Sequence, residues 1–147
     1  MTAEPMKKLA SNQDDQARAQ PVRAVPRIKA APRIRQMFWC DFSADARVPE
    51  MGKTRPVVVV SYRNTLSGTC TVVPTSTDPQ EGMSAQWAHK LSFQPDGRRD
   101  SWVVCNHIYT VSASRLAPLT GATAPRLGED EFNKIIELMH RWLPQLS

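Results

Sequence analysis

The chain has 147 residues, of which 41% are hydrophobic, and a formal net charge of +5. This length fits one ordinary domain with its own core, but not two. No apolar run approaches the roughly 20 residues that a membrane-spanning helix needs, and the N-terminus lacks the apolar core of a signal peptide. We therefore expect a cytoplasmic protein with no membrane segment.

The N-terminal residues 1–33 differ in composition from the rest of the chain. They contain seven Lys or Arg, three Asp or Glu, four Pro and no aromatic residue, with no sustained hydrophobic period. We predict a disordered basic extension over 1–33 and one folded domain over 34–147. The extension could bind polyanions through counterion release, or it could be solvated without any ligand.

Short apolar runs separated by polar turns follow, and this pattern is typical of β-strands. Four consecutive valines, at 57–60, favour a strand buried on both faces, and Pro56 is tolerated near the start of such a strand. The predicted strands cover residues 36–42, 55–62, 69–74, 87–93, 101–105 and 108–112.

The last part of the domain has a helical pattern instead. Over 128–143, acidic residues come first, basic residues come last, and the apolar residues recur at helical spacing on one face. The sequence therefore predicts an α+β fold, with a small antiparallel β-barrel or curled sheet and one C-terminal α-helix packed on it.

The cysteines and the common catalytic motifs exclude several kinds of site. Cys40, Cys70 and Cys105 are far apart, and no CxxC pair or zinc-like His/Cys spacing occurs, so we expect reduced thiols, no metal site and no cofactor. GxSxG, HExxH, Walker and GxGxxG motifs are absent as well. Any chemistry must use Arg, Ser or Thr, Glu, Asn or His, which suits a phosphate ester.

Four sequence blocks together resemble one known family. These are "MFWCDF", "KTRPVVVVS", "TVVP" followed by "TST", and "WVVCNHIYTVSASRL". In order and spacing they resemble the PemK/MazF toxins of type II toxin–antitoxin systems, over about residues 35–147. The resemblance implies an SH3-like β-barrel, a homodimer and a cognate antitoxin. It also implies a metal-independent endoribonuclease that cleaves single-stranded RNA such as mRNA. In that reaction the ribose 2′-OH attacks the adjacent phosphate and leaves a 2′,3′-cyclic phosphate.

The resemblance also assigns candidate catalytic residues. Arg55 matches the family's catalytic arginine before proline, and its guanidinium can form a fork onto two phosphate oxygens. Ser76 takes the position of the family's catalytic threonine, although which neighbouring hydroxyl acts stays open. Glu50 could orient Arg55, act as a base or be a solvated loop acid. His107 could transfer a proton near neutral pH, or it could be structural. The predicted RNA-binding residues are Lys53, Thr75, Thr77, Trp87 and Asn106.

The sequence departs from the family pattern at several places, among them Ser76 in the position of the threonine and Pro49 where some members carry a histidine. Val104 and Asn106 stand where some members carry an arginine and a carboxylate. Three alternatives therefore remain open. The chain could be a catalytically degenerate member, a CcdB-type toxin that binds DNA gyrase without catalysis, or an interaction barrel whose basic extension recruits nucleic acid.

Overall fold

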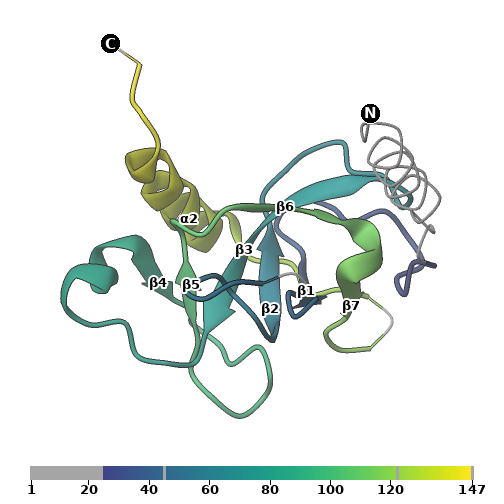
Figure 1. Cartoon of the computed structure of the whole chain (residues 1–147), viewed down its shortest axis with the longest axis horizontal. Helices are drawn as coiled ribbons and strands as arrows, with labels where there is room; N and C mark the ends of the chain where they lie inside the picture. The colour runs from purple at the N-terminus through teal and green to yellow at the C-terminus, as the bar shows by residue number, and fades with distance from the viewer. Residues whose placement is uncertain (1–24, 45, 122, 147) are drawn as a thin grey trace, which may run out of the picture.

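A computed structural model describes residues 25–44, 46–121 and 123–146 of the chain. Seven strands and one α-helix form its regular structure, together with two short 3₁₀ helices (Figure 1). The strands are β1 (Met37–Asp41), β2 (Thr54–Val59), β3 (Thr69–Ser76), β4 (Ala88–Lys90), β5 (Trp102–Val104), β6 (Tyr109–Ser112) and β7 (Leu116–Pro118). The helices are η1 (Gly82–Trp87), η2 (Ala113–Arg115) and α2 (Glu129–Trp142).

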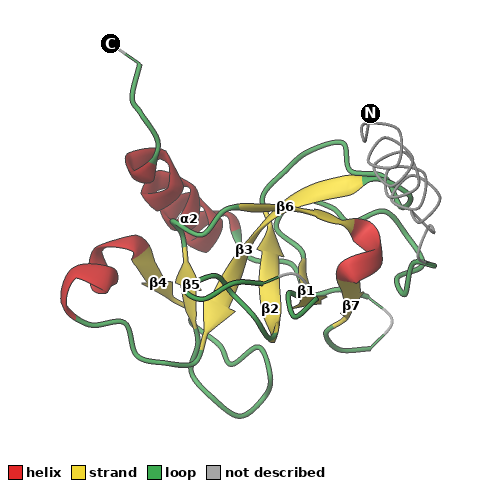
Figure 2. Ribbon diagram, viewed as in Figure 1, coloured by secondary structure: helices red, strands yellow, loops and turns green. Residues whose placement is uncertain are grey.

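All strand pairs are antiparallel, and the neighbours follow the order β4-β5-β3-β2-β1-β7, with β6 also paired to β3. The predicted α+β class with a C-terminal helix is thus confirmed (Figure 2). The sheet does not close into a barrel, because β4 and β7, at the two ends of this order, are not paired with each other within the described residues. The long strand β3 takes part in two further pairings, with β6 along its first half and with β5 at its last residues.

The valine run is buried on both faces, as the sequence predicts. Val57, Val58 and Val59 have no exposed surface. Because successive strand side chains point to opposite faces, Val57 and Val59 join one core cluster and Val58 joins the other. Complete burial of each valine contributes about 2 kcal/mol to folding. Strand β2 is therefore a rigid central element of the sheet.

Helix α2 covers the second core cluster with its apolar face. Phe132, Ile135 and Met139 are buried there, as the helical spacing predicts. Glu131, in the first turn, anchors the helix to the segment around β4. Its Oε1 accepts a hydrogen bond from the backbone N–H of Ser92 at 2.8 Å and lies 3.2 Å from His89 Nε2, and its Oε2 accepts from Ser92 Oγ at 2.9 Å. We call this cluster of His89, Ser92 and Glu131 the Glu131 clamp.

Three local features differ from the sequence prediction. The predicted strand at 87–93 is reduced to Ala88–Lys90, because η1 occupies the residues before it. The short strand β7 was not predicted, since its three residues carry no alternating pattern. Residues 25–33 have no regular structure, yet Ile28 is only 6% exposed and packs in the core cluster of Val57. The rest of the predicted disordered extension, 1–24, lies outside the described residues.

Neither a membrane helix nor a clustered metal site is found in the described ranges. No helix there is long and apolar enough to cross a bilayer. The same residues contain no group of three or more His, Cys, Asp or Glu that could hold a metal ion. Cys40, Cys70 and Cys105 are buried free thiols. Burial raises the pKa of each, to about 12, 11 and 12 respectively, so none of the three is a reactive thiolate at neutral pH.

Candidate functional site

Two prolines end the backbone ladder between β2 and β3. The paired residues run only from Val57–Pro74 to Val59–Val72, and neither Pro56 nor Pro74 has an N–H to donate. Side chains bridge the strands beyond this point. Thr75 Oγ1 donates to the Pro56 carbonyl at 2.8 Å, and Arg55 Nη1 donates to the Thr75 carbonyl at 3.3 Å. The strands therefore hold Arg55 in place without using most of its donors.

A cavity of about 300 Å³ opens where the ladder ends, and we call it the Arg55 cavity. Its walls come from β1, β2, the end of β3 and the loop between β4 and β5. The lining residues are Trp39, Lys53, Thr54, Arg55, Pro56, Thr75, Thr77, Asp78, Asp96, Arg99 and Ser101. Four of the predicted residues, Lys53, Arg55, Thr75 and Thr77, thus share one cavity.

Arg55 and His107 each have one buried nitrogen without a hydrogen-bond partner. Arg55 Nε is buried without a hydrogen bond among the described residues, and so is His107 Nδ1. Such orphaned atoms are rare in folded proteins and mark a place where a water, an ion or a ligand completes the bonding. Burial lowers the pKa of His107 below its ordinary value, and the nearby positive charge of Arg55 lowers it further. The imidazole is therefore neutral at pH 7 and able to accept a proton.

The hydroxyl groups at the end of β3 differ in what they can do. Thr75 Oγ1 is committed to the Pro56 carbonyl. Ser76 is 7% exposed, and its Oγ accepts a hydrogen bond from the backbone N–H of Asp78 at 3.2 Å. Continued by two residues, the β2–β3 register places Ser76 across from Arg55. Thr77 is half-buried and lines the cavity, and its hydroxyl makes no hydrogen bond within the described residues.

Five of the predicted residues do not line the Arg55 cavity: Ser76, His107, Glu50, Trp87 and Asn106. Glu50 is exposed, its Oε1 accepts from the backbone N–H of Arg47 at 2.8 Å, and it lines a separate hollow with Tyr109. The Trp87 ring packs against the Trp142 ring of α2, with 5.2 Å between centroids. Asn106 is half-buried in the turn after β5. The structure does not bring these side chains into the Arg55 cavity.

Sequence reasoning missed several residues of the cavity. Trp39 is half-buried, pairs with Pro56 on the neighbouring strand and lines the cavity. Asp96 and Arg99 belong to the segment "PDGRRD", which the sequence marks only as a turn. The signal that could have found them is the arginine pair in this turn, since two adjacent cations at a strand entrance suit an anion site.

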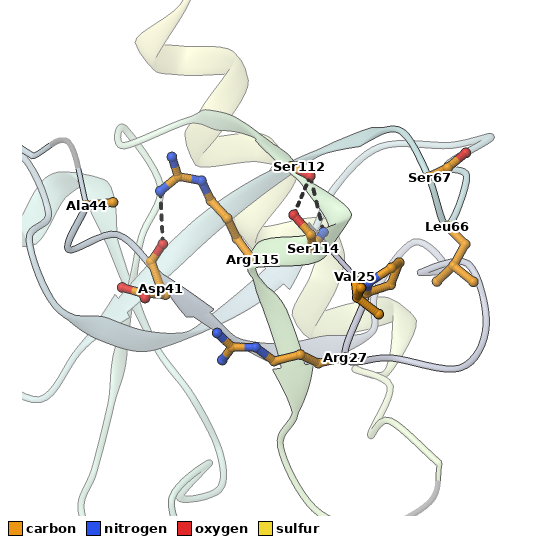
Figure 3. Close-up of a pocket in the computed structure, with 10 residues that line it drawn as sticks. Val25, Arg27, Asp41, Ala44, Leu66, Ser67, Ser112, Ser114 and Arg115 are labelled. Atoms are coloured by element: carbon orange, nitrogen blue, oxygen red, sulfur yellow. Dashed lines mark hydrogen bonds between the residues drawn. The ribbon is translucent and has the colours of Figure 1, made fainter. Parts of the chain in front are cut away.

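A larger hollow of about 710 Å³ lies beside η2 and the end of β1 (Figure 3). Its polar groups bond one another: Arg115 Nη1 donates to the Asp41 carbonyl at 3.1 Å, and the hydroxyls of Ser112 and Ser114 are 2.7 Å apart. We therefore place the candidate site at the smaller Arg55 cavity, where the buried Nε of Arg55 is left without a partner among the described residues.

The comparisons with known proteins agree with this class of fold. A sequence model of the PemK-like, MazF-like toxins of type II toxin–antitoxin systems matches residues 33–143, and the chain belongs to this family. A search of curated proteins found no match.

Solved structures of similar fold include MazF (form I) from Deinococcus radiodurans, with a TM-score of 0.59 and 16% identity, covering 77% of this chain and 96% of that one. An endoribonuclease from a Mycobacterial species, in complex with its cognate antitoxin, gives a TM-score of 0.57 and 18% identity over 79% of this chain and 100% of that one. Another Mycobacterial endoribonuclease gives 0.54 and 18% over 78% and 92%. These TM-scores establish a shared fold.

Proposed function

We propose that this protein is a toxin that cleaves single-stranded RNA without a metal ion and leaves a 2′,3′-cyclic phosphate. The observation that carries the proposal is Arg55, mounted on a buried strand with its Nε unpaired beside an open cavity. A guanidinium with free donors suits the phosphate that gains negative charge in the transition state. Membership of a toxin family and the endoribonucleases of similar fold support the same reaction.

In this proposal the substrate provides the nucleophile, and the protein orients the phosphate and moves protons. The 2′ oxygen bonds to phosphorus as the P–O5′ bond breaks, and the 5′ oxygen takes up a proton and leaves as a 5′-OH. Arg55 stabilises the phosphate charge. His107 does not line the cavity, but it lies near enough to Arg55 for that charge to lower its pKa, and we assign it the proton of the 2′-OH. Thr77 donates its hydroxyl to a phosphate oxygen, while Ser76 holds the turn through its bond to Asp78. Glu50 lies in a separate hollow, so we assign it no proton transfer.

The partners follow from the same family. We infer that the toxin acts as a homodimer on mRNA and that a cognate antitoxin neutralises it. The family description names a toxin–antitoxin system, and one protein of similar fold was solved with its antitoxin. Lys53 at the cavity rim supplies a further positive charge for the RNA backbone.

Product mapping tests the proposal. Purified protein is incubated with a long single-stranded RNA in EDTA, beside Arg55→Ala and the control Arg98→Ala, which removes the same charge from a residue outside the cavity. We expect discrete cuts with cyclic-phosphate 3′ ends from wild type and the control, and at least a 100-fold slower rate from Arg55→Ala. Absence of cleavage by folded, antitoxin-free protein would contradict the proposal and favour a degenerate or target-binding toxin.

A further inference from the structure

The turn between β4 and β5 presents a second arginine to the Arg55 cavity. Asp96 organises this turn: its Oδ1 accepts hydrogen bonds from the backbone N–H groups of Arg98 and Arg99, both at 2.9 Å. Gly97, between Asp96 and Arg98, has φ of +75°, a conformation that other residues rarely adopt. These bonds also lower the pKa of Asp96, so its carboxylate stays charged at neutral pH. The turn is thus fixed by hydrogen bonds between the Asp96 side chain and the backbone of the turn.

The same carboxylate also orients the Arg99 side chain. Asp96 Oδ2 accepts from Arg99 Nε at 3.2 Å, and the Asp96 side chain is 13% exposed whereas that of Arg99 is 67% exposed. Within the described residues, Nη1 and Nη2 of Arg99 have no hydrogen bond. A guanidinium held by its Nε keeps the edge formed by its two terminal nitrogens free for a bidentate contact with an anion.

Arg55 and Arg99 come from different parts of the sheet but line the same cavity. Arg55 projects from β2, in the centre of the sheet, while Arg99 approaches from the loop before β5. With Lys53, the cavity has three cationic side chains and two carboxylates, of which Asp96 is already paired with Arg99. Three cations and two carboxylates leave the cavity lining with a net charge of +1, and its two guanidinium groups come from separate places, which suits a chain of phosphate groups better than a single small anion.

We propose that Arg99 binds a backbone phosphate of the RNA next to the one that Arg55 binds, and that Asp96 is the positioning residue that aims it. This inference rests on the proposed function, because it takes the RNA strand at Arg55 as its starting point. Arg99 acts on binding and register of the strand and does not touch the reacting atoms. It therefore affects how tightly the substrate binds more than how fast a bound substrate reacts.

Binding of a short, mixed-sequence 2′-O-methyl RNA tests the proposal, because this probe lacks the nucleophile and cannot be cleaved. Arg98→Ala is the matched control: it removes the same charge one residue away, from a side chain that does not line the cavity. We expect Arg99→Ala to raise the dissociation constant about tenfold, and to reduce the salt slope of log K by about 0.7. Arg98→Ala should change the dissociation constant less than about twofold. Equal effects of the two variants would overturn the proposal.

A test of the positioning role of Asp96 must distinguish the loss of Arg99 orientation from a general loss of stability. Asp96→Asn is compared in the wild-type and Arg99→Ala backgrounds. If Asp96 acts through Arg99, its substitution weakens binding in the first background and has almost no effect in the second. An effect of equal size in both backgrounds would contradict the assignment.

The binding assay also separates this inference from the proposed function. A wild-type protein that binds the 2′-O-methyl probe through Arg99 but cleaves no RNA would refute the ribonuclease while supporting the phosphate contact. A protein that cleaves RNA with no difference between Arg99→Ala and Arg98→Ala, in KM or in probe binding, would refute only the role of Arg99.

Discussion

The two described histidines of the sheet region, His89 and His107, have opposite surroundings. His89 belongs to the Glu131 clamp, where the carboxylate oxygens of Glu131 bond Ser92 and His89. His107 has a buried Nδ1 without a partner and lies within the field of Arg55. A polar cluster that satisfies itself holds the fold together, whereas one that leaves buried atoms unpaired is ready for a ligand. The comparison separates the clamp, whose polar groups satisfy one another, from the surroundings of Arg55, where we propose that the chemistry takes place.

The largest expected effect is on activity at the cavity. Arg55→Lys keeps the positive charge but removes the fork of donors, so we expect RNA cleavage to slow about 100-fold. The free energy of unfolding should change little, since within the described residues the Arg55 side chain makes one hydrogen bond, of 3.3 Å to the Thr75 carbonyl, and lies near a strand end. Single-turnover kinetics and urea denaturation measure the two quantities. A cleavage rate equal to that of wild type would contradict the fork geometry.

The clamp should show the reverse behaviour. Glu131→Ala leaves the Ser92 N–H and the His89 ring without their acceptor, which should lower the free energy of unfolding by about 2 kcal/mol. Cleavage by the folded protein should be unchanged at a temperature well below the melting point. Exposed Glu137, which pairs with Arg141 on the same helix, provides the control Glu137→Ala, with a loss of less than about 0.5 kcal/mol. Loss of cleavage in folded Glu131→Ala would contradict the prediction that the clamp serves stability alone.

Acid should weaken the clamp as well. Burial acts to raise the pKa of Glu131, but hydrogen bonds from Ser92 and His89 outweigh it and leave the pKa below its ordinary value of 4.5. A carboxyl group with a depressed folded pKa stabilises the fold above its unfolded pKa, and this contribution is lost as the pH falls through the folded pKa. The stability difference between wild type and Glu131→Ala should therefore shrink below about pH 4.5.

The smallest effect concerns pH and the two histidines. Because the pKa of His107 lies below 6.5, its imidazole stays neutral at pH 7 and protonates only in more acidic solution. We expect the cleavage rate to fall about tenfold per pH unit below that pKa. His107→Gln should abolish this fall in cleavage rate at acidic pH, whereas His89→Gln should leave it unchanged. An NMR titration in which the His107 pKa does not rise in Arg55→Ala would contradict the electrostatic link.

Much of the scaffold follows from local sequence. The valine run predicts β2 because β-branched residues fit a strand, and the apolar spacing over 128–143 predicts α2 because it repeats with the helical turn. The family pattern predicts Arg55 as the site arginine. These features depend on neighbours in the chain, so the sequence is sufficient to locate them.

Only the tertiary structure decided what stands around Arg55. Trp39, Thr77 and Arg99 are far apart in the chain, and they meet because β1 and β3 pair with β2 while the β4–β5 turn folds over the same end. The sequence likewise could not separate His89 from His107, since the acceptor Glu131 lies 42 residues from His89. Strand pairing and helix docking join distant residues, and local propensity carries no information about such contacts.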